Sequence, residues 1–115
     1  MAQEPTIPEV DVAAADELVA GGALLLDVRE PDEWAAGHAP AAVHMAMGDV
    51  PASYGEIPTD RRIACICRSG ARSGRVTEYL RQFGLDIVNV AGGMQSWAAS
   101  GRPVVTDDGA PGQVI

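Results

Sequence analysis

The chain has 115 residues, enough for one domain with a single buried core and too few for two domains of ordinary size. Its hydrophobic fraction of 47% is typical of a globular protein rather than a disordered one. With 8 basic and 16 acidic side chains the formal charge is -8, so neither nucleic acid nor an anionic membrane is an expected partner.

The first quarter of the chain predicts a strand, a helix and a second strand. Residues 7–10 have the composition of a short strand, and Asp11 can cap a helix that the glycines at 21–22 end. The run 23–28 shows no alternation of apolar and polar residues. Such a run is typical of a strand that is buried on both faces of a parallel sheet.

The middle of the chain is less regular. Residues 29–40 are charged and rich in turn-forming residues, with one helical turn predicted at 32–36. Residues 42–45 predict a short third strand, and a short helix is predicted within 48–57, before Pro58.

The second half returns to clear strand and helix patterns. Residues 63–67 are apolar throughout and predict a fourth strand, and Gly84 is predicted to end the helix after it at the C′ position. A fifth strand is predicted at 87–90 and a short helix at 94–99, before a polar tail at 107–112 that is predicted to fray. The helix before Gly84 has the i, i+3, i+4, i+7 spacing of a buried stripe, formed by Val76, Tyr79, Leu80 and Phe83.

Strands that alternate with helices predict an α/β fold in which helices cover both faces of a parallel sheet. We expect one domain over residues 1–115, with a core at about 7–105 and short polar tails at both ends. Ligands of such sheets bind beyond the carboxyl ends of the strands. Cys67 and Asp27 each stand at the carboxyl end of a predicted strand, which places both at that edge.

A turn between the fourth strand and the next helix carries the candidate active site. A cysteine there is a candidate nucleophile, because the N–H groups of the turn and the positive end of the helix stabilise a thiolate without a histidine base. Gly70 allows the positive φ that such a turn needs, and Ser73 can donate to the sulfur or cap the helix. The full turn is Cys67-Arg68-Ser69-Gly70-Ala71-Arg72-Ser73.

The positive charge of this acidic chain is concentrated near that cysteine. Six of the eight basic residues lie between positions 61 and 81 with a single acid, Glu78, giving +5 there and -13 elsewhere. All eight are arginine, so lysine chemistry is excluded. We expect Arg68 and Arg72, inside the turn, to bind an anion. The other four are expected to be exposed to solvent, on the outer face of the helix or before the fourth strand: Arg61, Arg62, Arg75 and Arg81.

The remaining features indicate compartment and cofactors. Cys65 is predicted to be a core residue, with a resolving cysteine as the alternative. A disulfide between Cys65 and Cys67 would close almost no loop, which suggests a reducing compartment. Residues 1–5 have no basic region followed by an apolar run, and no segment has the roughly 20 apolar residues of a membrane helix. We expect a cytoplasmic protein without metal or cofactor.

Several blocks of the sequence together resemble a single-domain rhodanese. The resemblance covers about residues 7–105 and implies a three-layer α/β/α fold with a five-stranded parallel sheet. The blocks are, in chain order, Leu26-Asp27-Val28-Arg29-Glu30, Glu33-Trp34, Gly37-His38, the turn at 67–73, Ala91-Gly92-Gly93-Met94 with Trp97, and Gly101-Arg102-Pro103-Val104.

The resemblance implies a sulfurtransferase. Cys67 would take the outer sulfur of a small anionic donor such as thiosulfate, become a persulfide, and pass that sulfur to cyanide or a thiol acceptor. Arg68 and Arg72 match the family positions that bind the donor, and the amides of residues 68–72 would cradle the persulfide. A protein as the sulfur acceptor, or a rhodanese-like interaction module, is the open alternative.

The resemblance also concerns residues outside the turn. Asp27 and Arg29 match a motif for which we expect structural pairing, and His38 is expected to order its loop. Residues 39–44 depart from the family pattern Ile-Pro-Gly-Ala-x-Asn, so the geometry of that loop is not predicted.

Cysteine-dependent phosphatases and arsenate reductases are the second class with a cysteine, an arginine and an amide cup. They typically place one more residue between the cysteine and the arginine than the four that separate Cys67 from Arg72. The shorter loop between the cysteine and the arginine favours binding of a single sulfur atom over a tetrahedral phosphate.

Overall fold

Five strands form one sheet in the order β1-β5-β4-β2-β3, and every pair among residues 7–115 is parallel. Residues 7–115 are what the structure, a computed structural model, describes; most of the predicted N-terminal tail lies outside them. The parallel sheet confirms the predicted α/β fold. The strands are β1 (Glu9–Val10), β2 (Leu24–Asp27), β3 (Ala42–His44), β4 (Ile63–Ile66) and β5 (Ile87–Val90).

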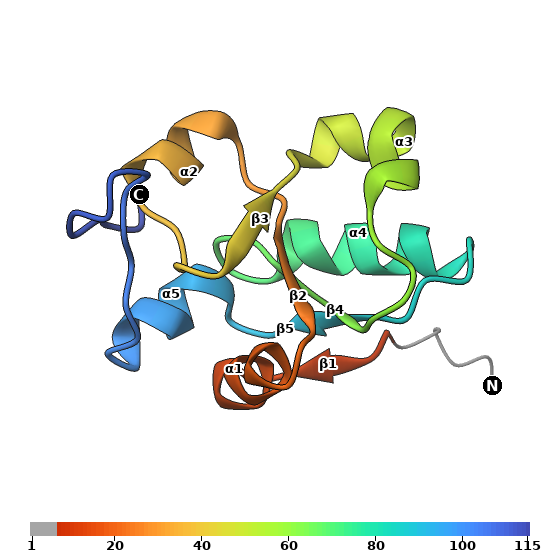
Figure 1. Ribbon diagram of the computed structural model, residues 1–115, viewed down its shortest axis with the longest axis horizontal. Helices are drawn as coiled ribbons and strands as arrows, with labels where there is room; N and C mark the ends of the chain where they lie inside the picture. The colour runs from red at the N-terminus through yellow and green to blue at the C-terminus, as the bar shows by residue number, and fades with distance from the viewer. Residues whose placement is uncertain (1–6) are drawn as a thin grey trace, which may run out of the picture.

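Helices cover both faces of this sheet (Figure 1). Apolar residues of β2 and β4 alternate between the two faces, and this burial on both sides explains their lack of polar alternation. No helix within residues 7–115 is long and apolar enough to cross a membrane. On one face lie α1 (Val12–Ala20) and α5 (Gly93–Ala99); on the other lie η1 (Met47–Asp49), α3 (Val50–Ser53), η2 (Tyr54–Glu56) and α4 (Ala71–Arg81); α2 (Pro31–Ala36) follows β2.

The structure confirms the predicted start of α1 but not the predicted end of the buried stripe on α4. The Asp11 side chain accepts a hydrogen bond from the Ala14 N–H at 2.8 Å, which confirms the predicted cap of α1. The stripe predicted for α4 is wrong at its end, because α4 stops at Arg81 and Phe83 is exposed beyond it. Phe83 stacks on Tyr54 instead, with ring centroids 4.6 Å apart.

The C-terminal segment is ordered, so the prediction of a frayed tail at 107–112 is wrong. Val105 forms an isolated bridge with His38, and the Gln113 N–H donates to the main chain at the end of α2. Gly37 makes this close approach feasible, because a Cβ there would lie 2.6 Å from the Gln113 nitrogen. The tail therefore runs beside α2, as Figure 1 shows.

Candidate active site

Cys67 lies directly beyond the carboxyl end of β4, next to Asp27 at the end of β2, since Asp27 pairs with Ile66 in the sheet. Both residues therefore stand at the sheet edge where the sequence predicts ligand binding. Cys67 is only 1% exposed and packs with the apolar cluster under α4. The thiol is thus shielded from bulk water, which strengthens any hydrogen bond to it.

The turn after Cys67 directs hydrogen-bond donors at its sulfur. The Gly70 N–H lies 3.1 Å from Sγ, and Gly70 has φ 107°, a conformation that only glycine adopts without strain. The Ser73 Oγ lies 3.2 Å from the same sulfur. Ser73 stands inside α4 and Gly70 occupies the cap, so the predicted alternative of a capping Ser73 is not what the structure shows.

Ser73 also links the sulfur to a buried polar side chain. Its Oγ lies 2.6 Å from Asn89 Oδ1, and the Asn89 amide donates to the carbonyl of Gly70 at 3.1 Å. A hydroxyl has one proton, so Ser73 can donate either to Asn89 or to Cys67 at a given moment. Ionisation of the thiol favours donation to the sulfur, because hydrogen bonds to a charged acceptor are stronger.

The two cysteines differ in acidity. Burial opposes ionisation of Cys67, but hydrogen bonds from the Ser73 hydroxyl and from the N–H groups of Ser73, Gly70 and Ser69 outweigh it and lower its pKa. Burial raises the pKa of Cys65, which is fully enclosed in the core. Of the two, Cys67 is the one that can act as a thiolate nucleophile.

Replacement of Ser73 with alanine should raise the pKa of Cys67. The variant loses one hydrogen bond to the thiolate, so we expect alkylation at neutral pH to slow by up to about tenfold. The measurement is the rate of Cys67 alkylation by iodoacetamide as a function of pH. An unchanged midpoint would mean that the main-chain N–H groups alone hold the thiolate.

Arg72 is bound by an acidic partner that the sequence does not predict. The Arg72 Nη1 donates to Oε1 of Glu33 in α2 at 2.6 Å, and the Arg72 Nη2 donates to Oε2 at 2.9 Å. The two side chains thus form a bidentate ion pair. This hydrogen bond from Arg72 lowers the pKa of Glu33 to about 2. Glu33 belongs to a block of the family resemblance, but nothing in that block names Arg72 as its partner.

Two other arginines of the basic segment, Arg68 and Arg62, have partners away from the sulfur of Cys67. The Arg68 Nε donates to the main-chain oxygen of Ile115 at 2.9 Å. Arg62 pairs with Asp86 at the amino end of β4, the end opposite the turn. The predicted concentration of positive charge is thus divided between the two ends of the strand. Within the turn itself, Arg68 and Arg72 are each engaged by a group of this chain.

A buried ion pair anchors α2 beside the site. Arg29 and Asp27 are both 0% exposed, with Nη2 and Oδ2 2.8 Å apart, and the Arg29 Nε also donates to Asp27. The Arg29 Nη2 donates to the carbonyl of Gly37 at 2.8 Å and its Nη1 to that of Glu33 at 3.3 Å. These contacts agree with the structural pairing expected of the two residues. They hold the helix that carries Glu33.

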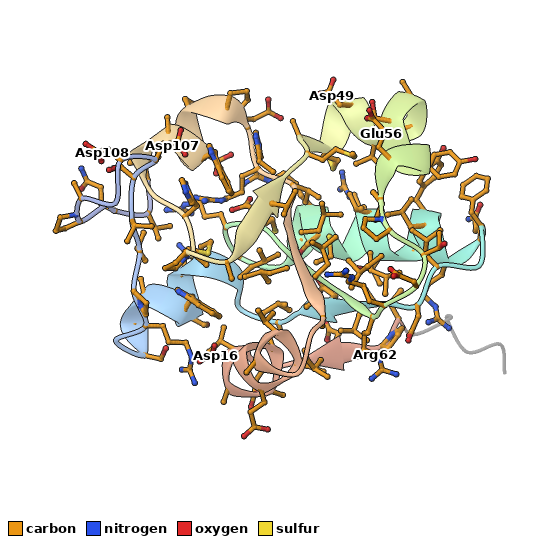
Figure 2. All side chains as sticks on the ribbon, viewed as in Figure 1. Asp16, Asp49, Glu56, Arg62, Asp107 and Asp108 are labelled. Carbon is orange, nitrogen blue, oxygen red and sulfur yellow. The ribbon has the colours of Figure 1, made fainter. Side chains whose placement is uncertain are left out.

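Two histidines enclose Trp34 at the other side of α2. The Trp34 and His38 rings are stacked with centroids 3.5 Å apart, and His44 stacks at 4.9 Å. His38 Nδ1 lies 2.9 Å from the Trp34 carbonyl oxygen, and His38 Nε2 lies 3.5 Å from Asp107 at the tip of the C-terminal loop (Figure 2). His38 thus orders its loop as expected, whereas the stacking of His44 is a feature the sequence does not reveal.

An apolar cavity of about 240 Å³ lies between α4 and the η1–α3 segment. Val50 and Val76 line it and belong to the same packed cluster as Cys67. The remaining lining residues are Met47, Pro51, Arg75 and Tyr79.

The chain is similar to a known family, to known sequences and to solved structures. Residues 11–100 match the family described as Rhodanese-like domain. A sulfurtransferase of Allochromatium vinosum is 42% identical over 87 residues, 75% of this chain and 81% of that protein. The YtwF protein of Bacillus subtilis (strain 168) is 41% identical over 99 residues, 84% of this chain and 96% of that protein. A crystal structure of a rhodanese-related protein from Thermoplasma volcanium has a TM-score of 0.82 at 34% identity, covering 87% of this chain and 99% of that one.

The fold and the turn define a class in which a cysteine thiolate at a strand-to-helix turn performs group transfer. The matches cover most of this chain and nearly all of two of the relatives. The chain therefore belongs to the rhodanese family of sulfurtransferases.

Proposed function

We propose that this protein moves sulfane sulfur from a small anionic donor such as thiosulfate to an acceptor such as cyanide or a thiol, through a persulfide on Cys67. The observation that carries the proposal is the sulfur of Cys67 with two donors, the Gly70 N–H and the Ser73 hydroxyl, within 3.2 Å. A mechanism that begins from a free thiolate suits the cytoplasm, where thiols remain reduced.

Each half of the reaction is a displacement at sulfur. The Cys67 thiolate attacks the outer sulfur of thiosulfate, a new S–S bond forms, and sulfite leaves with the electron pair of the S–S bond that breaks. Cyanide then attacks the terminal sulfur of the persulfide, and thiocyanate leaves while Cys67 returns to the thiolate. No proton, oxidant or reductant is needed in either half.

The turn stabilises both anionic states of the cycle. The N–H groups of Ser69, Gly70 and Ser73 face the thiolate, and the same groups can follow the negative charge to the terminal persulfide sulfur. Four residues between Cys67 and Arg72 make a small ring, which suits one added sulfur atom rather than a phosphate. This spacing supports sulfur transfer over phosphatase or arsenate reductase activity.

Intact mass spectrometry tests the proposal directly. Incubation with thiosulfate should raise the mass of the reduced protein by one sulfur atom, and cyanide should restore the original mass, because the persulfide is the only covalent intermediate proposed. The control is protein alkylated at Cys67 beforehand, which should gain no sulfur. A native protein that keeps its mass after thiosulfate treatment would contradict the proposed mechanism.

A further inference from the structure

The Glu33–Arg72 ion pair reduces the positive charge that the turn presents to an anion. Arg72 is 28% exposed and Glu33 13%, so the pair is partly shielded from water and weakly screened by salt. Its two charges cancel, and both terminal nitrogens of the guanidinium already donate to the carboxylate. An incoming anion therefore meets a neutral pair instead of a free cation.

Glu33 is also held where it stands. The Glu33 Oε1 accepts a hydrogen bond from the Glu30 N–H at 3.0 Å as part of the capping box of α2. The main-chain carbonyl of Glu33 accepts a second one from Arg29. If an anion displaced Glu33 from Arg72, the carboxylate would remain close by, little exposed and without its cation. It would then repel the anion that displaced it, and the repulsion would grow with the charge of that anion.

The second arginine of the turn does not compensate for this neutral pair. Arg68 donates its Nε to Ile115, so its guanidinium is drawn toward the C-terminal segment. Arg68 is exposed, so solvent screens its charge, and the donors that contact the sulfur of Cys67 are main-chain N–H groups and the Ser73 hydroxyl, which carry partial charges only. Such donors suffice for a persulfide with one charge and are weak partners for a dianion.

We infer that Glu33 determines donor specificity by neutralising Arg72, so that the site favours sulfane donors with a single negative charge, such as thiosulfonates and organic persulfides, over the dianion thiosulfate. This inference rests on the proposed function. Thiosulfate remains a substrate, but Glu33 weakens its binding. Glu33 touches neither the sulfur nor the donor; it acts by neutralising Arg72 and by repelling an anion that takes its place there.

The test compares two donors that differ in charge and little in shape. Methanethiosulfonate carries a methyl group where thiosulfate carries a charged oxygen; attack on its outer sulfur breaks the S–S bond and releases methanesulfinate with the electron pair. In Glu33→Gln, glutamine preserves the capping box while removing the charge. The KM for thiosulfate should fall about tenfold, the value of one regained charge-assisted hydrogen bond, with kcat within about twofold. The KM for methanethiosulfonate should fall about threefold or less.

Matched variants separate this role from a general effect of charge. Asp32→Asn removes the same charge from the neighbouring, exposed position of α2 and should leave both KM values unchanged. Adding Arg72→Gln to Glu33→Gln should cancel the gain for thiosulfate. Equal changes for both donors, or a thiosulfate KM that stays the same or rises in Glu33→Gln, would overturn the inference.

Calorimetric binding keeps this inference separate from the proposed function. With Cys67→Ser as background no turnover occurs, and thiosulfate should bind about tenfold more tightly when Glu33→Gln is added. Equal dissociation constants would refute the role of Glu33 even if the wild type forms a persulfide. A tighter complex would support it even if the mass experiment fails.

Discussion

Cys67→Ser is expected to reduce thiocyanate formation from thiosulfate and cyanide by at least about a thousandfold. Serine cannot form the S–S bond of the intermediate, and its hydroxyl does not ionise at neutral pH. The turn keeps its Gly70 and Ser73 donors in this variant, so the loss would report the nucleophile itself. The measurement is the steady-state rate of thiocyanate release at saturating donor.

Cys65→Ser is the matched control for this experiment. Cys65 lies two residues earlier in the same chain segment, but it is fully buried and burial raises its pKa. We expect the variant to retain most of the wild-type rate at a temperature where it remains folded. Equal loss in both variants would contradict the assignment of Cys65 to the core and favour a resolving role.

The positions of the strands along the chain were the most predictable part of the fold. The runs at 23–28 and 63–67 lack alternation because β2 and β4 are buried on both faces, and this is a local property of the sequence. The predicted burial of Phe83 on α4 was wrong because the i+7 position continues the helical spacing in the sequence. In the structure α4 has already ended, and the ring finds Tyr54 from η2.

The position of Cys67 could be predicted for the same reason: a nucleophile at a strand end is defined by its neighbours in the chain. Glu33 and Arg72 are far apart in sequence, and the fold brings them together with Arg29 holding α2 beside the turn. The order of the C-terminal tail depends likewise on contacts with α2 that no local pattern encodes. The charge pattern of the sequence indicates a basic segment, but it does not show that Arg62, Arg68 and Arg72 have partners within the chain.

Arg29→Met is expected to lower the free energy of unfolding by about 3 to 5 kcal/mol. The substitution leaves the Asp27 carboxylate buried at 0% exposure without its cation, and methionine cannot donate to the carbonyls of Gly37 and Glu33. A buried charge without a partner is among the most costly changes a small domain can undergo. Urea unfolding followed by circular dichroism would give the difference.

Arg102→Met provides the matched control, because Arg102 pairs with Asp16 at 3.0 Å in a solvent-accessible position, with the arginine 24% and the aspartate 51% exposed. Solvent screens such a pair, and we expect a loss of at most about 1 kcal/mol in the free energy of unfolding.

The two variants should also differ in activity, because Arg29 anchors the helix that carries Glu33. A loosened α2 would release Arg72, so the thiosulfate KM should fall in Arg29→Met and stay constant in Arg102→Met. Equal destabilisation by the two substitutions would mean that the buried pair does not anchor α2.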